Sequence, residues 1–153
     1  MSMITIKMNA VTSLVLMVAM GTAYADNYAG LVKEAKGNAT IERGAQKLAA
    51  QPGVKVLVSD RVTTGADSSV GITLDDGTLL SAGPNSTLSL NKFSFNSTTN
   101  QGVLDASLKR GTLAVVSGKL SKTSPDAVTY RTPTSILGVR GTEFVLEAGG
   151  GEN

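Results

Sequence analysis

Apolar and polar residues alternate with a period of two through most of the chain after Gly53. Six segments place apolar side chains at every second position: 54–58, 70–74, 88–90, 113–115, 128–130 and 144–146. Alternation of this kind is typical of a strand with one buried face. No stretch of ten or more residues after residue 26 has helical periodicity. The pattern therefore predicts an all-β protein of about eight to ten short strands.

Turn sequences separate these segments. Asp75-Asp76-Gly77 places a glycine where a tight hairpin needs a positive backbone angle, and Gly83-Pro84-Asn85 is another turn. The stretch from Asn91 to Gly102 is rich in Asn, Ser and Thr and predicts a projecting loop, with the two phenylalanines at 93 and 95 on the strand before it. Spacing alone is compatible with a sandwich, a barrel or a solenoid. Small side chains and scarce aromatic residues favour the thin core of a short-stranded β-solenoid-like single domain.

Composition narrows the function classes. The chain of 153 residues has room for one domain, and its net charge is only +2. Basic residues are spread along the sequence, which argues against nucleic acid as a partner. The chain contains neither Cys nor His, so it lacks disulfides, a thiol nucleophile and the most common base and nitrogen ligands. We expect no metal, no cofactor and no enzymatic activity.

The first 25 residues have the organisation of a signal peptide. Lys7 precedes an apolar run over 10–20, and Ala23-Tyr24-Ala25 gives the small-x-small pattern of a cleavage site. The run is shorter than the roughly 20 residues that span a bilayer, so cleavage between Ala25 and Asp26 is favoured over an uncleaved anchor. We expect a periplasmic protein with no stable membrane insertion after cleavage. The expected organisation is a signal peptide (1–25), an N-terminal β segment (26–52), the main domain (53–147) and a flexible tail (148–153).

Three pieces of the sequence, in order, resemble the FecR domain. The first is Val58–Val70 (VSDRVTTGADSSV), similar to the family's Gly-Asp-x-Val-x-Thr-Gly opening, with Ser59 where the family prefers glycine. The second is Ile72–Leu90, containing ITLDDGTLL and GPNSTLSL. The third is Arg131–Val145 (RTPTSILGVRGTEFV), which is close to the closing signature of the family. The resemblance covers most of the chain from Val54 to Glu147.

The resemblance implies a periplasmic, β-rich, solenoid-like domain that binds other proteins. The best-known FecR proteins are transmembrane regulators that pass a signal from an outer-membrane receptor to a cytoplasmic sigma factor. We expect this chain to lack their spanning helix and cytoplasmic segment, so only the periplasmic recognition role is carried over. The expected function is that of an exported protein-binding module in envelope signalling or regulation, with another envelope protein as its partner.

Several polar and glycine residues within these pieces are predicted to be structural. In Gly138-Val139-Arg140-Gly141-Thr142, the glycines would permit a tight turn and Arg140 would fold inward, where it satisfies buried carbonyls or pairs with a carboxylate such as Asp60. The functional alternative is that Arg140 contacts a ligand or partner. The full set of predicted motif residues is Asp60, Gly65, Asp76, Gly77, Gly138, Arg140, Gly141 and Thr142.

Other candidate chemistries are weaker. Asp67, Asp75 and Asp76 fall short of a calcium loop, which needs more acids at fixed spacing. Serine and lysine residues between 117 and 122 have no recognised catalytic motif around them. A cell-wall carbohydrate-binding module would need an exposed aromatic platform, whereas the few aromatic residues mostly alternate inward. A structural or self-assembling β protein is the remaining alternative.

Overall fold

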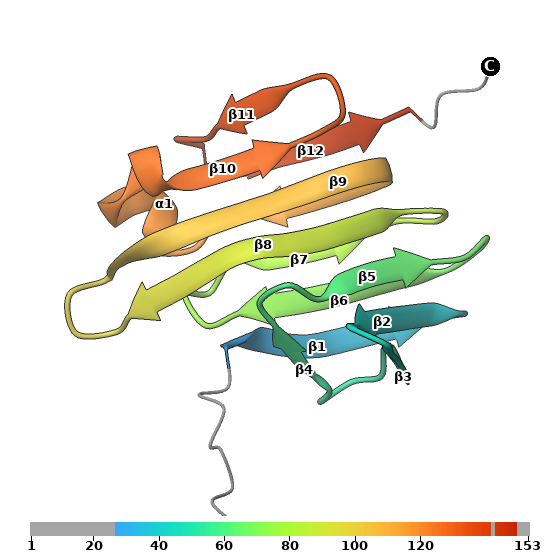
Figure 1. Ribbon diagram of the computed structural model, residues 1–153. Coiled ribbons are helices and arrows are strands. Elements are labelled where there is room, and N and C mark those ends of the chain that lie inside the picture. The colour runs from blue at the N-terminus through green and yellow to red at the C-terminus, as the bar shows by residue number, and fades with distance from the viewer. Residues whose placement is uncertain (1–26, 142, 150–153) are drawn as a thin grey trace, which may run out of the picture.

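The computed structural model describes residues 27–141 and 143–149. The predicted signal peptide lies outside the described residues. The described chain folds into twelve strands and two short helical turns, so the all-β prediction is confirmed (Figure 1). The strands are β1 (Tyr28–Lys36), β2 (Ala39–Arg43), β3 (Gln46–Ala49), β4 (Lys55–Leu57), β5 (Arg61–Thr64), β6 (Ser69–Leu74), β7 (Leu79–Ala82), β8 (Thr87–Asn96), β9 (Gln101–Val116), β10 (Val128–Arg131), β11 (Ile136–Gly138) and β12 (Glu143–Ala148). The helical turns are α1 (Leu120–Thr123) and the 3-10 turn Pro125–Ala127.

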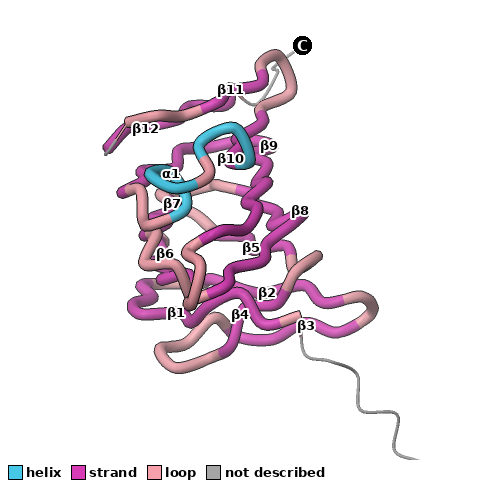
Figure 2. Tube along the Cα trace, turned by 90° about the vertical axis from the view of Figure 1, so that its left-hand side faces the viewer, coloured by secondary structure: helices cyan, strands magenta, loops and turns pink. Residues whose placement is uncertain are grey.

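The strands form one sheet that curls into two facing layers, and β9 belongs to both (Figure 2). The first layer has the order β4-β1-β6-β7-β9-β12, where β9 contributes its second half. The second layer has the order β3-β2-β5-β8-β9-β10-β11, where β9 contributes its first half. The four edge strands of the described sheet are therefore β3, β4, β11 and β12.

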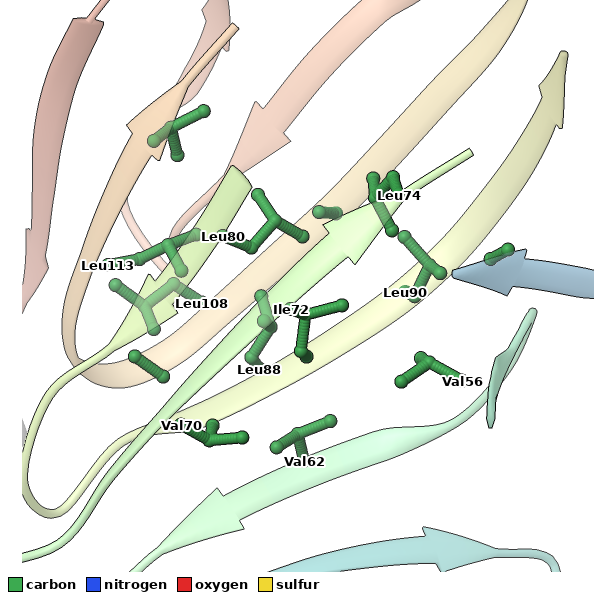
Figure 3. Close-up of a cluster of buried hydrophobic side chains, with 14 of the residues drawn as sticks. Val56, Val62, Val70, Ile72, Leu74, Leu80, Leu88, Leu90, Leu108 and Leu113 are labelled. Atoms are coloured by element: carbon green, nitrogen blue, oxygen red, sulfur yellow. The ribbon is translucent and has the colours of Figure 1, made fainter. Parts of the chain in front are cut away.

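The core lies between the two layers and consists of aliphatic side chains. Along β6, Val70, Ile72 and Leu74 are buried, whereas the alternate residues Gly71 and Thr73 face outward, as the period-two pattern predicts. Figure 3 shows the β6 side chains facing those of β8 and β9. Few aromatic rings take part, so the core is filled mainly by Val, Leu and Ile.

The long strand β9 crosses from one layer to the other at Gly111. This glycine has a φ of 93°, and an added Cβ would overlap the side chain of Ser86. The sequence predicts a separate short strand from Thr112 to Ser117. The structure instead joins those residues to the preceding segment, because Gly111 bends the strand without interrupting it.

The prediction of a projecting loop between Asn91 and Gly102 is wrong. β8 continues to Asn96 and β9 starts at Gln101, so only a four-residue turn, 97–100, separates them. The polar residues that suggested a loop lie on the exposed side of this hairpin, while Phe93 on the other side is buried. Exposed polar residues on a two-stranded extension have the composition of a loop, although the backbone is paired.

A solenoid-like winding is not confirmed. Nearly all strand pairs are antiparallel, and β9–β10 is the parallel pair among the described residues. Residues of the predicted N-terminal segment take part in the same sheet, since β1 pairs with β6 and β2 pairs with β5. At the other end, β12 includes Ala148, whose side chain is buried. No helix in the described part of the chain is long and apolar enough to cross a bilayer.

Candidate functional site

Among the residues that the structure describes, seven polar residues are buried, and most of them lie at turns. They are Asp60, Thr64, Ser68, Asp76, Thr78, Ser86 and Asp105. All except Asp105 fall within Val58–Val70 and Ile72–Leu90, two of the pieces that carry the family resemblance. Buried polar groups must form hydrogen bonds to offset their loss of water. Their hydrogen bonds therefore indicate what these motifs do.

Asp60 holds the turn between β4 and β5. Its carboxylate accepts hydrogen bonds from Arg43 Nε at 2.9 Å and Nη2 at 2.7 Å, and from the backbone N–H of Leu57 at 2.8 Å. Arg43 also donates to the carbonyl of Lys55, which ties β2 to β4. Ser59, in the same turn, has a φ of 74°, a conformation that glycine adopts more easily. The preference of the family for glycine here thus has a backbone explanation.

Asp76 joins the β6–β7 hairpin to α1. Its carboxylate accepts hydrogen bonds from the backbone N–H and hydroxyl of Thr78 and from the backbone N–H of Leu120 at 3.2 Å. Gly77 has a φ of 87° and donates to the carbonyl of Leu74, so the predicted hairpin turn is observed. Burial, together with the negative charge of Asp76, raises the pKa of Tyr130 above its ordinary value.

A second buried network connects the turns around Gly65 and Pro84. The Thr64 hydroxyl donates to the carbonyl of Gly83 at 2.6 Å and accepts from the backbone N–H of Ser86 at 2.9 Å. Gly65 donates its N–H to the carbonyl of Asn38 at 2.9 Å. An added Cβ at Gly65 would meet its neighbours only at 3.6 Å, so its role is backbone pairing and not close approach.

Arg140 does not fold inward. Its side chain is 79% exposed and lies 3.5 Å from Asp126, which is 93% exposed. Asp60, its suggested partner, is occupied by Arg43. No sequence signal distinguished the two arginines, because the pairing joins the end of β2 to a turn 17 residues later.

Gly138 and Gly141, which flank Val139 and Arg140, do not form the tight turn that the sequence predicts. Neither glycine has a positive φ. A Cβ added at Gly138 would meet no atom within 4 Å, and a Cβ added at Gly141 would meet only the side chain of Val139, at 3.9 Å. Gly138 ends β11 on the exposed edge of the second layer. Thr142, the last residue of this motif, lies outside the described residues.

A third ionic cluster escaped the sequence analysis. Arg131 Nε donates to both carboxylate oxygens of Asp105 at 3.1 Å, and Asn91 Nδ2 donates to one of them at 3.0 Å. These contacts join β8, β9 and β10 on the outer face of the second layer. Asp105 lies between the buried residues Leu104 and Ala106. Neither the alternation of apolar and polar residues nor the local composition therefore marked it as a member of an ion pair.

The candidate catalytic and metal-binding residues have other contacts. Ser121 donates its hydroxyl to the carbonyl of Gly118, and Lys119 Nζ lies 6.0 Å from the centre of the Phe95 ring. Asp76 is buried in its hairpin, while Asp75 and Asp67 are exposed. Within residues 27–141 and 143–149, no three His, Cys, Asp or Glu side chains gather as a metal site would require.

Aromatic side chains do not form a platform on the described surface. Tyr130, which is buried, and Phe144, which is half-buried, pack edge to face, with ring centres 5.1 Å apart and planes at 73°. Phe93 is buried and Phe95 is half-buried. A carbohydrate site built on stacked sugar rings therefore has no support among these residues.

The exposed apolar residues concentrate at the C-terminal end of the fold. Ile136 is 68% exposed on β11 and Val145 is 65% exposed on β12. Among the described strands, β11 pairs only with β10, so the backbone groups on its other side have no strand partner there. The other three edge strands each carry charged residues: Lys47 on β3, Lys55 on β4, and Glu143 and Glu147 on β12. β11 contains no charged residue, and it is the edge with least protection against pairing with another chain.

Comparison with protein families gives one match, to the model described as FecR protein, over residues 60–153. Comparison with curated proteins and with solved structures finds no match. The match covers more than half of the chain, begins at Asp60 and contains the Asp76 hairpin and the β11 edge. This chain therefore belongs to the FecR protein family.

Proposed function

We propose that this protein is an exported, non-catalytic binding module of the FecR type, which recognises another envelope protein in signalling or regulation. The family assignment supports a signalling or regulatory role. The N-terminal sequence, with Lys7, an apolar run and Ala23-Tyr24-Ala25, supports export to the periplasm.

The observation that carries the proposal is the open edge of β11. An extended segment of a partner can add to such an edge through backbone hydrogen bonds, while pockets and exposed side chains select its sequence. Ile136 and Leu137 provide apolar contacts at this edge, being 68% and 37% exposed. The lack of charge on β11 means that the partner strand would meet no lysine or glutamate at this position.

Affinity capture from a periplasmic extract tests this proposal. Ile136→Lys places a protective charge on the β11 edge, and Val145→Lys is the matched control, since Val145 is equally apolar and 65% exposed on another strand. We expect an envelope protein to be captured by the wild-type chain and by Val145→Lys, but lost with Ile136→Lys. Equal capture by both variants would exclude the β11 edge as the binding site. Binding to purified murein sacculi instead of a protein would favour the carbohydrate alternative.

A further inference from the structure

Two consecutive basic residues, Lys109 and Arg110, project from the same face of β9. Successive residues of a regular strand point to opposite faces. Here the pairing with β8 shifts between Leu88↔Leu108 and Thr87↔Arg110, so Lys109 is an extra residue in a β-bulge. Both side chains are exposed and line the same hollow on the outer face of the second layer. The bulge redirects side chains that alternation would have separated.

The hollow spans four adjacent strands, which lie side by side in Figure 1. It has a volume of about 260 Å³ and is lined by Glu42 of β2, Arg61 and Thr63 of β5, Thr87 of β8, and Lys109 and Arg110 of β9. The strand pairings bring these residues together, since Thr63 lies opposite Thr87, and Thr87 lies opposite Arg110. Three cations and two hydroxyl groups therefore surround one shallow depression.

The positive charge of this hollow is largely uncompensated. Glu42 is the one acidic residue in the lining, and it approaches Arg61 only to 3.8 Å, with the two side chains 34% and 53% exposed. Within the described ranges, Lys109 and Arg110 form no ion pair. The crossing of β9 between the layers accounts for a bend at Gly111, but it does not require two cations beside it.

Charge is also unevenly distributed over the whole molecule. The outer face of the second layer carries six basic residues and two acidic ones: Lys47, Arg61, Lys92, Lys109, Arg110 and Arg131, with Glu42 and Asp105. The rest of the chain after residue 25 has seven basic and ten acidic residues. A protein of nearly neutral net charge thus has one distinctly basic face, which attracts anions towards the hollow.

We propose that this hollow binds a phosphate group. Arginine guanidinium groups match the geometry of phosphate oxygens, lysine adds a point charge, and threonine hydroxyls donate hydrogen bonds. Three cations and one carboxylate leave two positive charges, enough to balance the charge of about −1.5 to −2 on a phosphate monoester or the single negative charge on the phosphodiester of a lipid headgroup. The group can belong to a soluble phosphate compound or to a lipid headgroup, because the recognising chemistry is the same. The site is separate from β11 and goes beyond the proposed protein-binding function.

The test uses the purified protein with two probes. Pyrophosphate is titrated while backbone amide NMR signals are followed, and vesicles of phosphatidylglycerol are compared with vesicles of phosphatidylcholine in co-sedimentation. The double variant Lys109→Gln/Arg110→Gln removes two charges from the hollow. Lys33→Gln/Lys36→Gln removes two charges from β1 in the other layer and serves as the matched control. Arg61→Gln is a second variant within the hollow and removes one charge.

We expect pyrophosphate to shift the amide signals around Thr63, Thr87 and Lys109, with binding that weakens as salt increases. Affinity should fall by at least about tenfold in Lys109→Gln/Arg110→Gln, fall less in Arg61→Gln, and stay unchanged in the control. Binding to phosphatidylglycerol vesicles alone, lost in the same variant, would support the site and identify the lipid headgroup as its source. The proposal is overturned if neither probe binds at about 10 mM, or if the control loses as much affinity as the double variant.

Discussion

Truncating Arg43 tests whether the buried Asp60 carboxylate holds the turn between β4 and β5. Asp60 is 1% exposed, and Arg43 supplies two of its three hydrogen bonds, at 2.9 and 2.7 Å. In Arg43→Ala the carboxylate keeps the backbone N–H of Leu57 but loses its neutralising charge. A buried charge without its partner is strongly unfavourable.

The expected loss of stability follows from this geometry. Removing one partner of a buried ion pair costs about 3–5 kcal/mol. Because Arg43 is itself 30% exposed, water reaches part of the pair, and we expect the lower end, about 3 kcal/mol. Arg140→Ala is the matched control. Arg140 and Asp126 are 79% and 93% exposed and 3.5 Å apart, so its removal should change stability by less than about 0.5 kcal/mol.

Urea and thermal unfolding, followed by circular dichroism, measure both effects. We expect Tm to fall by roughly 10 °C in Arg43→Ala and by no more than about 2 °C in Arg140→Ala. Arg43→Lys keeps the charge without the two-pronged geometry, and it should lie between the wild type and Arg43→Ala. Equal Tm values for the two alanine variants, or a larger loss in Arg140→Ala, would refute the assignment of Asp60 to Arg43.

Two further substitutions test the backbone and the buried aromatic cluster. Ser59→Gly should stabilise the protein by about 0.5–1 kcal/mol in urea unfolding, because the residue has a φ of 74°; a loss of stability would contradict this reading. The pKa of the Tyr130 phenol is raised in the folded state, mainly by burial and also by the negative charge of Asp76. Above about pH 10 the phenol ionises in the unfolded chain but not in the folded protein, so stability should fall as the pH rises through this range. Tyr130→Phe should reduce this alkaline loss of stability. The measurement is the unfolding midpoint of the variant and of the wild type at pH 8 and at about pH 11. An equal loss in both proteins would show that other groups cause it.

The sequence by itself determined the strand content and several turns. The apolar residues Val70, Ile72 and Leu74 alternate with polar or small ones because one side of a single strand is buried, and in β6 these three side chains are buried as predicted. The Asp75-Asp76-Gly77 hairpin depends on one local backbone requirement, the positive φ of Gly77. Family membership was also readable, since it rests on ordered motifs and not on three-dimensional contacts. Local chemistry was sufficient for each of these conclusions.

The tertiary structure alone decided which strands pair and which charges meet. A period of two identifies the buried face of a strand but not its neighbour, so it could not separate a solenoid from a curled antiparallel sheet. For the same reason, the sequence could not assign Asp60 to Arg43 instead of Arg140, because that choice depends on β2 lying beside β5. The bulge at Lys109 likewise arises from its pairing with β8, and a strand read alone would place Lys109 and Arg110 on opposite faces.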